Sequence, residues 1–160
     1  MVTNKSPTRG IEPLEVAVSG VDGPYYVDVA QQFSHGLAVV SEVTKVLVYD
    51  TTRKPDDRLQ ERDRDTGLLL WEVVVLDLNP EAREKTFRVR MGADVQPVLP
   101  PMAAGLPLRF VQLEGVSIST YPKVTGRNRG TGQDIVRLAY SVSATGMSAT
   151  KPASADAKAA

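Results

Sequence analysis

The amino-acid sequence predicts an all-β fold, and three observations lead to this prediction. Between residues 14 and 147, apolar residues recur with a period of two or in short runs, as is typical of strands. Turn-forming residues separate these runs, for example at Asp65-Thr66-Gly67, Asn79-Pro80 and the glycine-rich segment Gly126–Gly132. The one plausible helix, Asn79–Lys85, has Asn and Pro at its start but spans at most about two turns, and it could instead be a helical turn in a hairpin loop.

The predicted strands follow one another in a simple order. An extra N-terminal strand, Leu14–Val21, alternates apolar and polar residues, and five main strands follow it. These main strands are Gly36–Asp50, Leu68–Leu78, Lys85–Gly92, Leu108–Pro122 and Ile135–Met147. The first main strand is long, which suggests that it bends or serves two sheets. Four prolines in Val95–Leu108 predict an irregular connection between the third and fourth main strands.

This strand count predicts a five-stranded OB-like Greek-key barrel, whose first strand is long and whose third-to-fourth connection is variable. The rival architecture is an immunoglobulin-type sandwich, which needs about seven strands and a buried tryptophan that Trp71 could supply. We therefore expect a single β-barrel domain over residues 14–147, preceded by a flexible N-terminus at 1–13. Residues 148–160 are rich in Ala, Ser, Lys and Pro, and this composition predicts a disordered tail.

The composition argues against several classes of protein. Lys and Arg together number 19, as do Asp and Glu, so net charge gives no attraction to nucleic acid or to an anionic membrane. The absence of cysteine excludes disulfides and thiolate metal sites. The N-terminus lacks a secretory signal, and apolar runs such as Leu68–Trp71 are far shorter than the roughly 20 residues of a membrane helix. We expect a cytoplasmic protein without membrane contact.

No pattern in the sequence indicates an enzyme or a cofactor site. His35 is the single histidine, and a Ser-His-Asp triad with Ser34 or Ser41 is formally possible. However, no nucleophile motif accompanies these residues, and a lone histidine at the start of a strand is usually structural. The segment "GRNRGTGQD" lacks the end of a phosphate-binding loop. We therefore expect a non-enzymatic protein.

The segment "DRDTG" raises the question of a cation site. Asp63 and Asp65 are two apart, as in an EF-hand loop, but Gly67 stands at the fifth position and Val74 at the twelfth. A calcium loop needs glycine at the sixth position and glutamate at the twelfth. We predict a turn instead, in which Asp and Thr side chains accept backbone N–H bonds and Gly67 adopts a positive φ.

Four blocks of sequence carry a family resemblance. They are "HGLAVVSEVTKVLVYDTT", "RDRDTGLLLWEVVVLD", "VQPVLPPMAAGLPLRFVQLEGVSISTY" and "RLAYSVSATGM", within about Phe33–Met147. The chain resembles small actinomycete proteins of integrative conjugative elements and related plasmids, described as plasmid replication, integration and excision activators. The resemblance implies a role in the replication and mobilisation of such elements, but it implies no catalytic residues.

Nucleic-acid binding is the function that the strand pattern favours. OB folds bind across strands 2 and 3, between the loops that join strands 1–2 and 4–5. In this chain those loops are Thr51–Asp65, in which opposite charges cancel, and Lys123–Asp134, which is basic. The third main strand places two arginines on the face opposite to Phe87, Val89 and Met91. The predicted nucleic-acid-binding residues are Arg88, Arg90, Lys123, Arg127 and Arg129.

Three functional hypotheses follow. The first is an accessory protein that binds single-stranded DNA and works with replication or recombination proteins of the element. The second is a protein-interaction module without nucleic-acid contact, which the low aromatic content of 6% favours. The third is a transcriptional activator that reads DNA with a β-ribbon, since no helix-turn-helix pattern is present. An unpaired strand such as Leu14–Val21 could also pair with a second copy to form a homo-oligomer.

Overall fold

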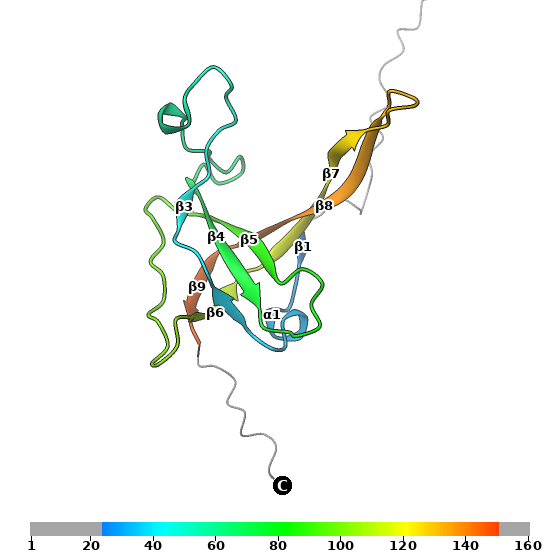
Figure 1. The fold of residues 1–160 in the computed structure, drawn as a ribbon. Coiled ribbons are helices and arrows are strands. Elements are labelled where there is room, and N and C mark those ends of the chain that lie inside the picture. The colour runs from blue at the N-terminus through cyan, green and yellow to red at the C-terminus, as the bar shows by residue number, and fades with distance from the viewer. Residues whose placement is uncertain (1–23, 151–160) are drawn as a thin grey trace, which may run out of the picture.

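The computed structural model describes residues 24–150, and within them the chain forms one open, mixed β-sheet of nine strands (Figure 1). The all-β prediction is confirmed. The predicted strand Leu14–Val21 and the flexible segment 1–13 lie outside the described residues. The order of eight strands across the sheet is β1 (Tyr25–Tyr26), β7 (Ser117–Arg127), β8 (Asp134–Ala144), β5 (Thr86–Gly92), β4 (Leu70–Asp77), β2 (Leu37–Val39), β6 (Arg109–Glu114) and β9 (Gly146–Ala149). The ninth strand, β3 (Thr44–Lys45), pairs with β4 only.

The long first main strand is bent. Its segment Gly36–Asp50 divides into β2 and β3, and both pair antiparallel with β4. Val39 of β2 lies opposite Val75, whereas Lys45 of β3 lies opposite Trp71. The segment therefore follows β4 along its length, with a break between the two paired parts. The sequence suggested either a bent strand or a strand shared by two sheets, and the structure shows a bent strand within one sheet.

The last two main strands form one continuous ribbon with a sharp corner. Glu114 of β6 lies opposite Gly146 of β9, and Ser117 of β7 lies opposite Ser143 of β8. The antiparallel register is therefore the same on both sides of the corner. On one side β6 pairs antiparallel with β2, and on the other side β8 pairs parallel with β5. The corner lets a single ribbon join two parts of the sheet.

A glycine and a threonine form this corner. Gly115 has a φ of +56°, a value that residues with a Cβ rarely adopt. The backbone N–H of Thr145 donates a 2.8 Å hydrogen bond to the carbonyl of Glu114, and its hydroxyl donates to the same oxygen at 3.1 Å. The corner is therefore held by local polar contacts as well as by the strands on either side.

The core lies on one face of the central strands. Its members are apolar residues of β2, β4, β5 and β6, one residue between β2 and β3, and two residues beside the corner. They are Leu37, Val39, Val43, Trp71, Val73, Val75, Val89, Met91, Val111, Leu113, Val116 and Ala144. Trp71 is 6% exposed, and its Nε1 donates a 2.9 Å hydrogen bond to the carbonyl of Ala93. The ring is thus buried, and its N–H group has a hydrogen-bond acceptor within the protein. Trp71 is a core residue, as the alternation of β4 predicts.

Several local predictions are corrected or refined. Asn79–Lys85 forms a turn in place of a helix; Ala82 donates to the carbonyl of Asn79 at 3.1 Å. Residues 95–108 form the predicted irregular connection.

The sequence did not predict two short elements. They are the helix α1 (Val29–Gln32), which the Asp28 side chain caps, and the 3-10 turn η1 (Pro55–Asp57). Ser148 and Ala149 belong to β9 and not to a disordered tail, because their backbone pairs with β6; residues 151–160 lie outside the described residues.

Beyond the corner, the ribbon of β7 and β8 extends away from the rest of the sheet (Figure 1). On the other side of β4, a long irregular segment at 46–69 extends in a similar direction. The ribbon residues from 121 to 138 are all exposed. The ribbon and the irregular segment therefore flank the central strands, and this arrangement positions the candidate site.

Candidate nucleic-acid interface

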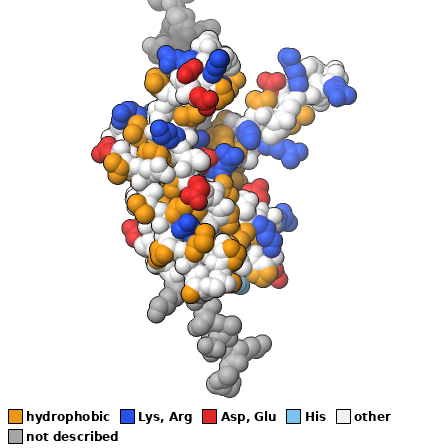
Figure 2. Space-filling model, turned by 60° about the vertical axis from the view of Figure 1, so that its left-hand side comes forward, with side chains coloured by type: hydrophobic (Ala, Val, Ile, Leu, Met, Phe, Trp, Pro, Cys, Tyr) orange, Lys and Arg blue, Asp and Glu red, His pale blue; other side chains and the backbone are white. Residues whose placement is uncertain are grey.

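A groove of roughly 970 Å³ lies where the ribbon of β7 and β8 leaves the body of the molecule. Strand alternation divides its lining into two sides. One side is cationic and carries Arg88, Arg90, Tyr121, Lys123 and Arg137. The other side is apolar, and includes Phe33, Phe87, Leu138 and Tyr140. Figure 2 shows Lys and Arg side chains along the ribbon and on the neighbouring surface of the body, with acidic side chains among them.

The two arginines of β5 reach the cationic side because the strand alternates. Val89 and Met91 are buried in the core, so Arg88 and Arg90 point to the opposite face. The sequence predicts this placement correctly. The Arg88 side chain is 73% exposed and that of Arg90 is 41% exposed, so both guanidinium groups are accessible to a ligand.

The ribbon continues the same face. Arg90 lies opposite Ser143 in the parallel pair of β5 and β8, so every second residue of β8 counted back from Ser143 shares the face of the arginines. Arg137 is one of these residues, and it lies opposite Lys123 of β7. Tyr121, two residues before Lys123, follows the same alternation. One face therefore presents four cationic side chains and one aromatic ring.

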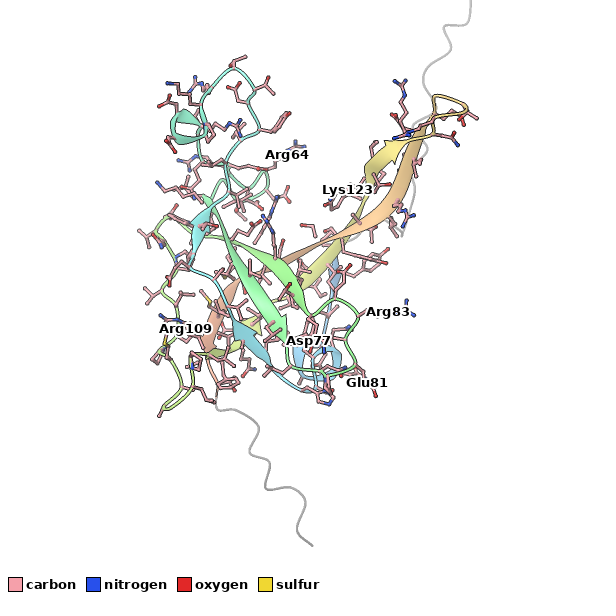
Figure 3. The ribbon with its side chains drawn as sticks, viewed as in Figure 1. Arg64, Asp77, Glu81, Arg83, Arg109 and Lys123 are labelled. Carbon is pink, nitrogen blue, oxygen red and sulfur yellow. The ribbon has the colours of Figure 1, made fainter. Side chains whose placement is uncertain are left out.

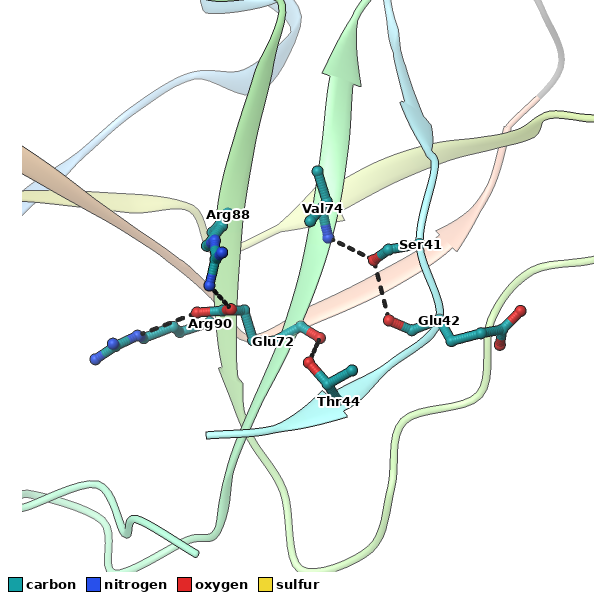
Figure 4. A network of polar contacts seen from close by, with 7 residues as sticks. All are labelled: Ser41, Glu42, Thr44, Glu72, Val74, Arg88 and Arg90. Atoms are coloured by element: carbon teal, nitrogen blue, oxygen red, sulfur yellow. Dashed lines mark hydrogen bonds and ion pairs between the residues drawn. The ribbon is translucent and has the colours of Figure 1, made fainter. Parts of the chain in front are cut away.

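One carboxylate lies among these cations. The Arg88 Nη1 atom donates a 2.8 Å hydrogen bond to Glu72 Oε1, and Arg90 Nε lies 3.7 Å from Glu72 Oε2 (Figure 4). Glu72 is on β4, directly opposite Arg90 in the antiparallel register. Glu84 is a second carboxylate in the lining. Four cations and two carboxylates leave a net charge of two positive units on the groove.

The remaining two predicted residues lie elsewhere. Arg127 and Arg129 are near the tip of the ribbon and do not line the groove. Arg127 Nε donates a 2.6 Å hydrogen bond to the carbonyl of Gly132 and lies 3.8 Å from Asp134 Oδ1. Of the five predicted residues, the structure thus brings together Arg88, Arg90 and Lys123. Figure 3 shows Lys123 on the ribbon and Arg64 on the irregular segment.

The segment Lys123–Asp134 is not the flexible glycine-rich loop that its composition suggests. β7 continues to Arg127 and β8 begins at Asp134, so only the residues between them form the turn. The Asn128 side chain accepts backbone hydrogen bonds from Gly130 at 2.8 Å and Thr131 at 3.2 Å. Cross-strand pairing holds Lys123 on a defined face of a strand.

Sequence reasoning omitted Arg137, Tyr121 and Tyr140 from the site. The tyrosines lie in predicted strands, but the sequence does not show which strand pairs with them or which face of the sheet their rings occupy. Arg137 can be assigned to the site once the turn between β7 and β8 is located, because antiparallel pairing then places it opposite Lys123. On the apolar side, Phe33 and Phe87 stack with ring centroids 5.3 Å apart, an arrangement that joins α1 to β5.

The segment "DRDTG" forms the predicted turn. Asp63 Oδ1 accepts hydrogen bonds from the backbone of Asp65 at 2.9 Å and of Thr66 at 2.8 Å, and from the Thr66 hydroxyl at 3.0 Å. Gly67 has a φ of +72°. The backbone hydrogen bond from Thr66 is the main reason why the pKa of Asp63 is lowered from its ordinary value of 3.8. The Asp63 carboxylate is thus committed to the turn.

The second hollow is smaller and of a different character. It measures roughly 270 Å³ and is lined mainly by apolar residues near α1, with His35 among them. The Ser34 hydroxyl lies 3.4 Å from His35 Nδ1, and both residues are exposed neighbours in the chain. Among residues 24–150, no three His, Cys, Asp or Glu side chains gather where they could hold a metal ion.

Comparisons with protein-family models, with curated proteins and with solved structures found no match. The helices of the described part of the chain are too short to cross a membrane.

Proposed function

We propose that this chain is a non-enzymatic accessory protein of a mobile genetic element, and that it binds single-stranded DNA in the groove beside β5. One observation carries the proposal: Arg88, Arg90, Lys123 and Arg137 converge on one groove face, with Tyr121 beside them. The four cations come from β5, β7 and β8, and β5 is far from the other two strands in sequence. Their convergence is therefore a property of the folded sheet.

The chemistry of the groove fits a flexible nucleic-acid strand. Arginine and lysine side chains can neutralise backbone phosphates and release their counterions. An exposed tyrosine ring can stack on a base, which contributes about 1–3 kcal/mol per base and tolerates any sequence. A net charge of only two positive units on the groove predicts modest affinity that weakens as salt is added.

The topology supports an OB-like reading of the sheet. If β2 with β3, β6 with β7, and β8 with β9 are each counted as one bent strand, five strands remain besides the two-residue strand β1. The corner ribbon then pairs with β2 through β6 and with β5 through β8, so it joins the two strands that flank β4. In OB folds the ligand crosses the second and third strands between two flanking connections. Here those strands are β4 and β5, and the flanking parts are residues 46–69 and the ribbon.

The four sequence blocks that resemble the plasmid replication, integration and excision activators support the biological setting. Replication, integration and excision of an element would provide single-stranded DNA in the cytoplasm. Proteins of the same replication or recombination machinery would be its neighbours on that DNA.

Fluorescence anisotropy with labelled oligo-dT tests the proposal. The protein should bind at about 50 mM salt, and its affinity should fall by roughly an order of magnitude or more at about 200 mM salt. Unlabelled duplex DNA of the same length should compete less well than unlabelled oligo-dT. Absence of binding at the lower salt concentration would show that the proposal is wrong.

A protein-interaction module is the second candidate, and the ribbon favours it through a separate observation. The face opposite to Lys123 exposes Val124, Val136, Leu138 and Tyr140. Exposed apolar residues that cluster on one strand face are typical of protein contacts. If oligo-dT does not bind, this face becomes the principal candidate for function.

A further inference from the structure

Glu72 occupies an unusual position in the cationic groove. Its side chain is 14% exposed, far less than those of Arg88 and Arg90, which it contacts. A charged side chain is rarely withdrawn from water unless it is paired. The carboxylate therefore holds both arginines toward one point on the groove wall.

The backbone around Glu72 makes the carboxylate the fixed partner. β4 is an interior strand, paired with β5 on one side and with β2 and β3 on the other. The Thr44 hydroxyl donates a 3.4 Å hydrogen bond to the carbonyl of Glu72 (Figure 4). The arginines are long side chains with more exposed ends. A ligand can therefore draw the guanidinium groups outward, whereas the carboxylate stays in place.

Carboxylate and phosphate present similar groups to arginine. Each offers two oxygen atoms to the N–H groups of a guanidinium. In the free protein, Oε1 of Glu72 accepts the hydrogen bond from Arg88, and Oε2 takes the longer ion pair with Arg90. A phosphate that enters the groove must compete with Glu72 for the same donors.

We infer that Glu72 is an internal competitor of the nucleic-acid phosphates and limits the affinity of the groove. This inference rests on the proposed function. Its carboxylate cancels one of the two arginine charges, so a bound strand gains only part of the attraction that both would give. The groove thereby holds single-stranded DNA weakly enough to release it.

Replacement of the carboxylate by a neutral amide tests the inference. Glu72→Gln should bind oligo-dT about fivefold more tightly than the wild-type chain, as expected for the loss of one competing ion pair of up to about 1 kcal/mol. The dependence of log affinity on log salt should become steeper by about 0.7, the increment for one further phosphate on a single strand. Binding is measured by anisotropy at a series of salt concentrations.

Glu84→Gln is the matched control. Glu84 lines the same groove and the substitution removes the same charge, but the ion pairs of Arg88 and Arg90 are made with Glu72. If Glu72 competes specifically with phosphate, Glu84→Gln should increase the affinity for oligo-dT less than Glu72→Gln does. Glu72→Asp is the second variant; it keeps the charge and shortens the reach toward the arginines, and it should also bind more tightly. Circular dichroism and unfolding curves check that each variant folds.

The outcomes separate the two proposals. If the wild-type chain binds and Glu72→Gln binds equally well, or if Glu84→Gln gives the same gain, the inference is wrong and the proposed function stands. If neither the wild-type chain nor Glu72→Gln binds oligo-dT, both are wrong. If Glu72→Gln alone binds, Glu72 is a competitor strong enough to block the groove, and the proposed function fails for the natural sequence.

Discussion

The guanidinium of Arg88 on β5 donates a 2.8 Å hydrogen bond to the carboxylate of Glu72 on β4. This contact joins two neighbouring strands on the outer face of the sheet, at the edge of the groove. It places one carboxylate on a face that carries four cationic side chains. The cations are concentrated locally and partly compensated locally, so the groove is the place to test for phosphate binding.

Removal of both arginines from β5 should weaken binding. For Arg88→Ala with Arg90→Ala, we expect at least a tenfold loss of affinity for oligo-dT at low salt and a salt dependence shallower by about 1.4, which corresponds to two lost phosphate contacts. The free energy of unfolding should also fall, by about 1–3 kcal/mol, because the Glu72 carboxylate, which is only 14% exposed, loses both cationic partners. Arg83→Ala, an exposed arginine outside the groove, is the control. Unchanged affinity in the double variant would place the site elsewhere.

Tyr121 should contribute through its ring and not through its hydroxyl. Tyr121→Ala should weaken oligo-dT binding by about five- to 150-fold, the equivalent of about 1–3 kcal/mol for one stacked base. Tyr121→Phe should bind like the wild-type chain. Tyr49 is 85% exposed and does not line the groove, so Tyr49→Ala provides the matched loss of a surface tyrosine. Equal effects of Tyr121→Ala and Tyr49→Ala would contradict a stacking role.

The base of the ribbon should matter more than its tip. Lys123 and Arg137 face each other across β7 and β8 and line the groove, whereas Arg129 is near the turn. Lys123→Ala with Arg137→Ala should make the salt dependence shallower by about 1.4. Arg129→Ala should leave it nearly unchanged. If the same anisotropy titration shows a larger change in salt dependence for Arg129→Ala than for the double variant, the ligand lies along the ribbon tip.

Gly115 should be the least replaceable glycine of the corner. A Cβ at this position would overlap the Thr145 side chain, and the φ of +56° adds backbone strain. We expect Gly115→Ala to reduce the free energy of unfolding by about 2–4 kcal/mol, measured by urea titration of the Trp71 fluorescence. Gly105 has a φ of +77°, but a Cβ added there would meet no atom within 4 Å, so Gly105→Ala should cost only about 1 kcal/mol. Equal costs would mean that the contact with Thr145 is absorbed without effect.

The Asp63 turn should make a pH-dependent contribution to stability. Because the pKa of Asp63 in the folded chain is below its ordinary value of 3.8, the contribution is fully present above that pH and is lost as pH falls through the folded value. At neutral pH, Asp63→Ala should lower the free energy of unfolding by about 1 kcal/mol. The difference from the wild-type chain should shrink in strong acid. Asp65→Ala is the control, and a difference that stays constant with pH would contradict the prediction.

Much of the local structure is encoded in short segments of the sequence. Alternation in β4 and β5 assigns Trp71, Val89 and Met91 to the core and the arginines between them to the outer face, because successive strand residues point to opposite sides. The turn at Asp63 follows from the hydrogen-bonding capacity of Asp and Thr side chains and from the positive φ of Gly67. These features need no information about distant parts of the chain.

The corner and the groove depend on contacts between distant segments. Alternation predicts one strand over residues 108–122 and another over 135–147, and it contains no sign that both bend at Gly115 and Thr145. The bend arises because the ribbon must pair with β2 at one end and β5 at the other. The same pairing turns an apparent glycine loop into an ordered strand at Lys123 and leaves Arg127 bound to its own turn.

By itself, the sequence determined an all-β chain, the face on which each β4 and β5 residue lies, and the absence of net charge. Only the tertiary structure decided which of the charged residues meet. Glu72 reaches Arg88 and Arg90 because β4 pairs with β5 in one register, and Lys123 and Arg137 join them because β8 pairs with β5. Pairing between strands acts over long separations in sequence, whereas alternation and turn chemistry act over a few residues, so the groove could be predicted only in part.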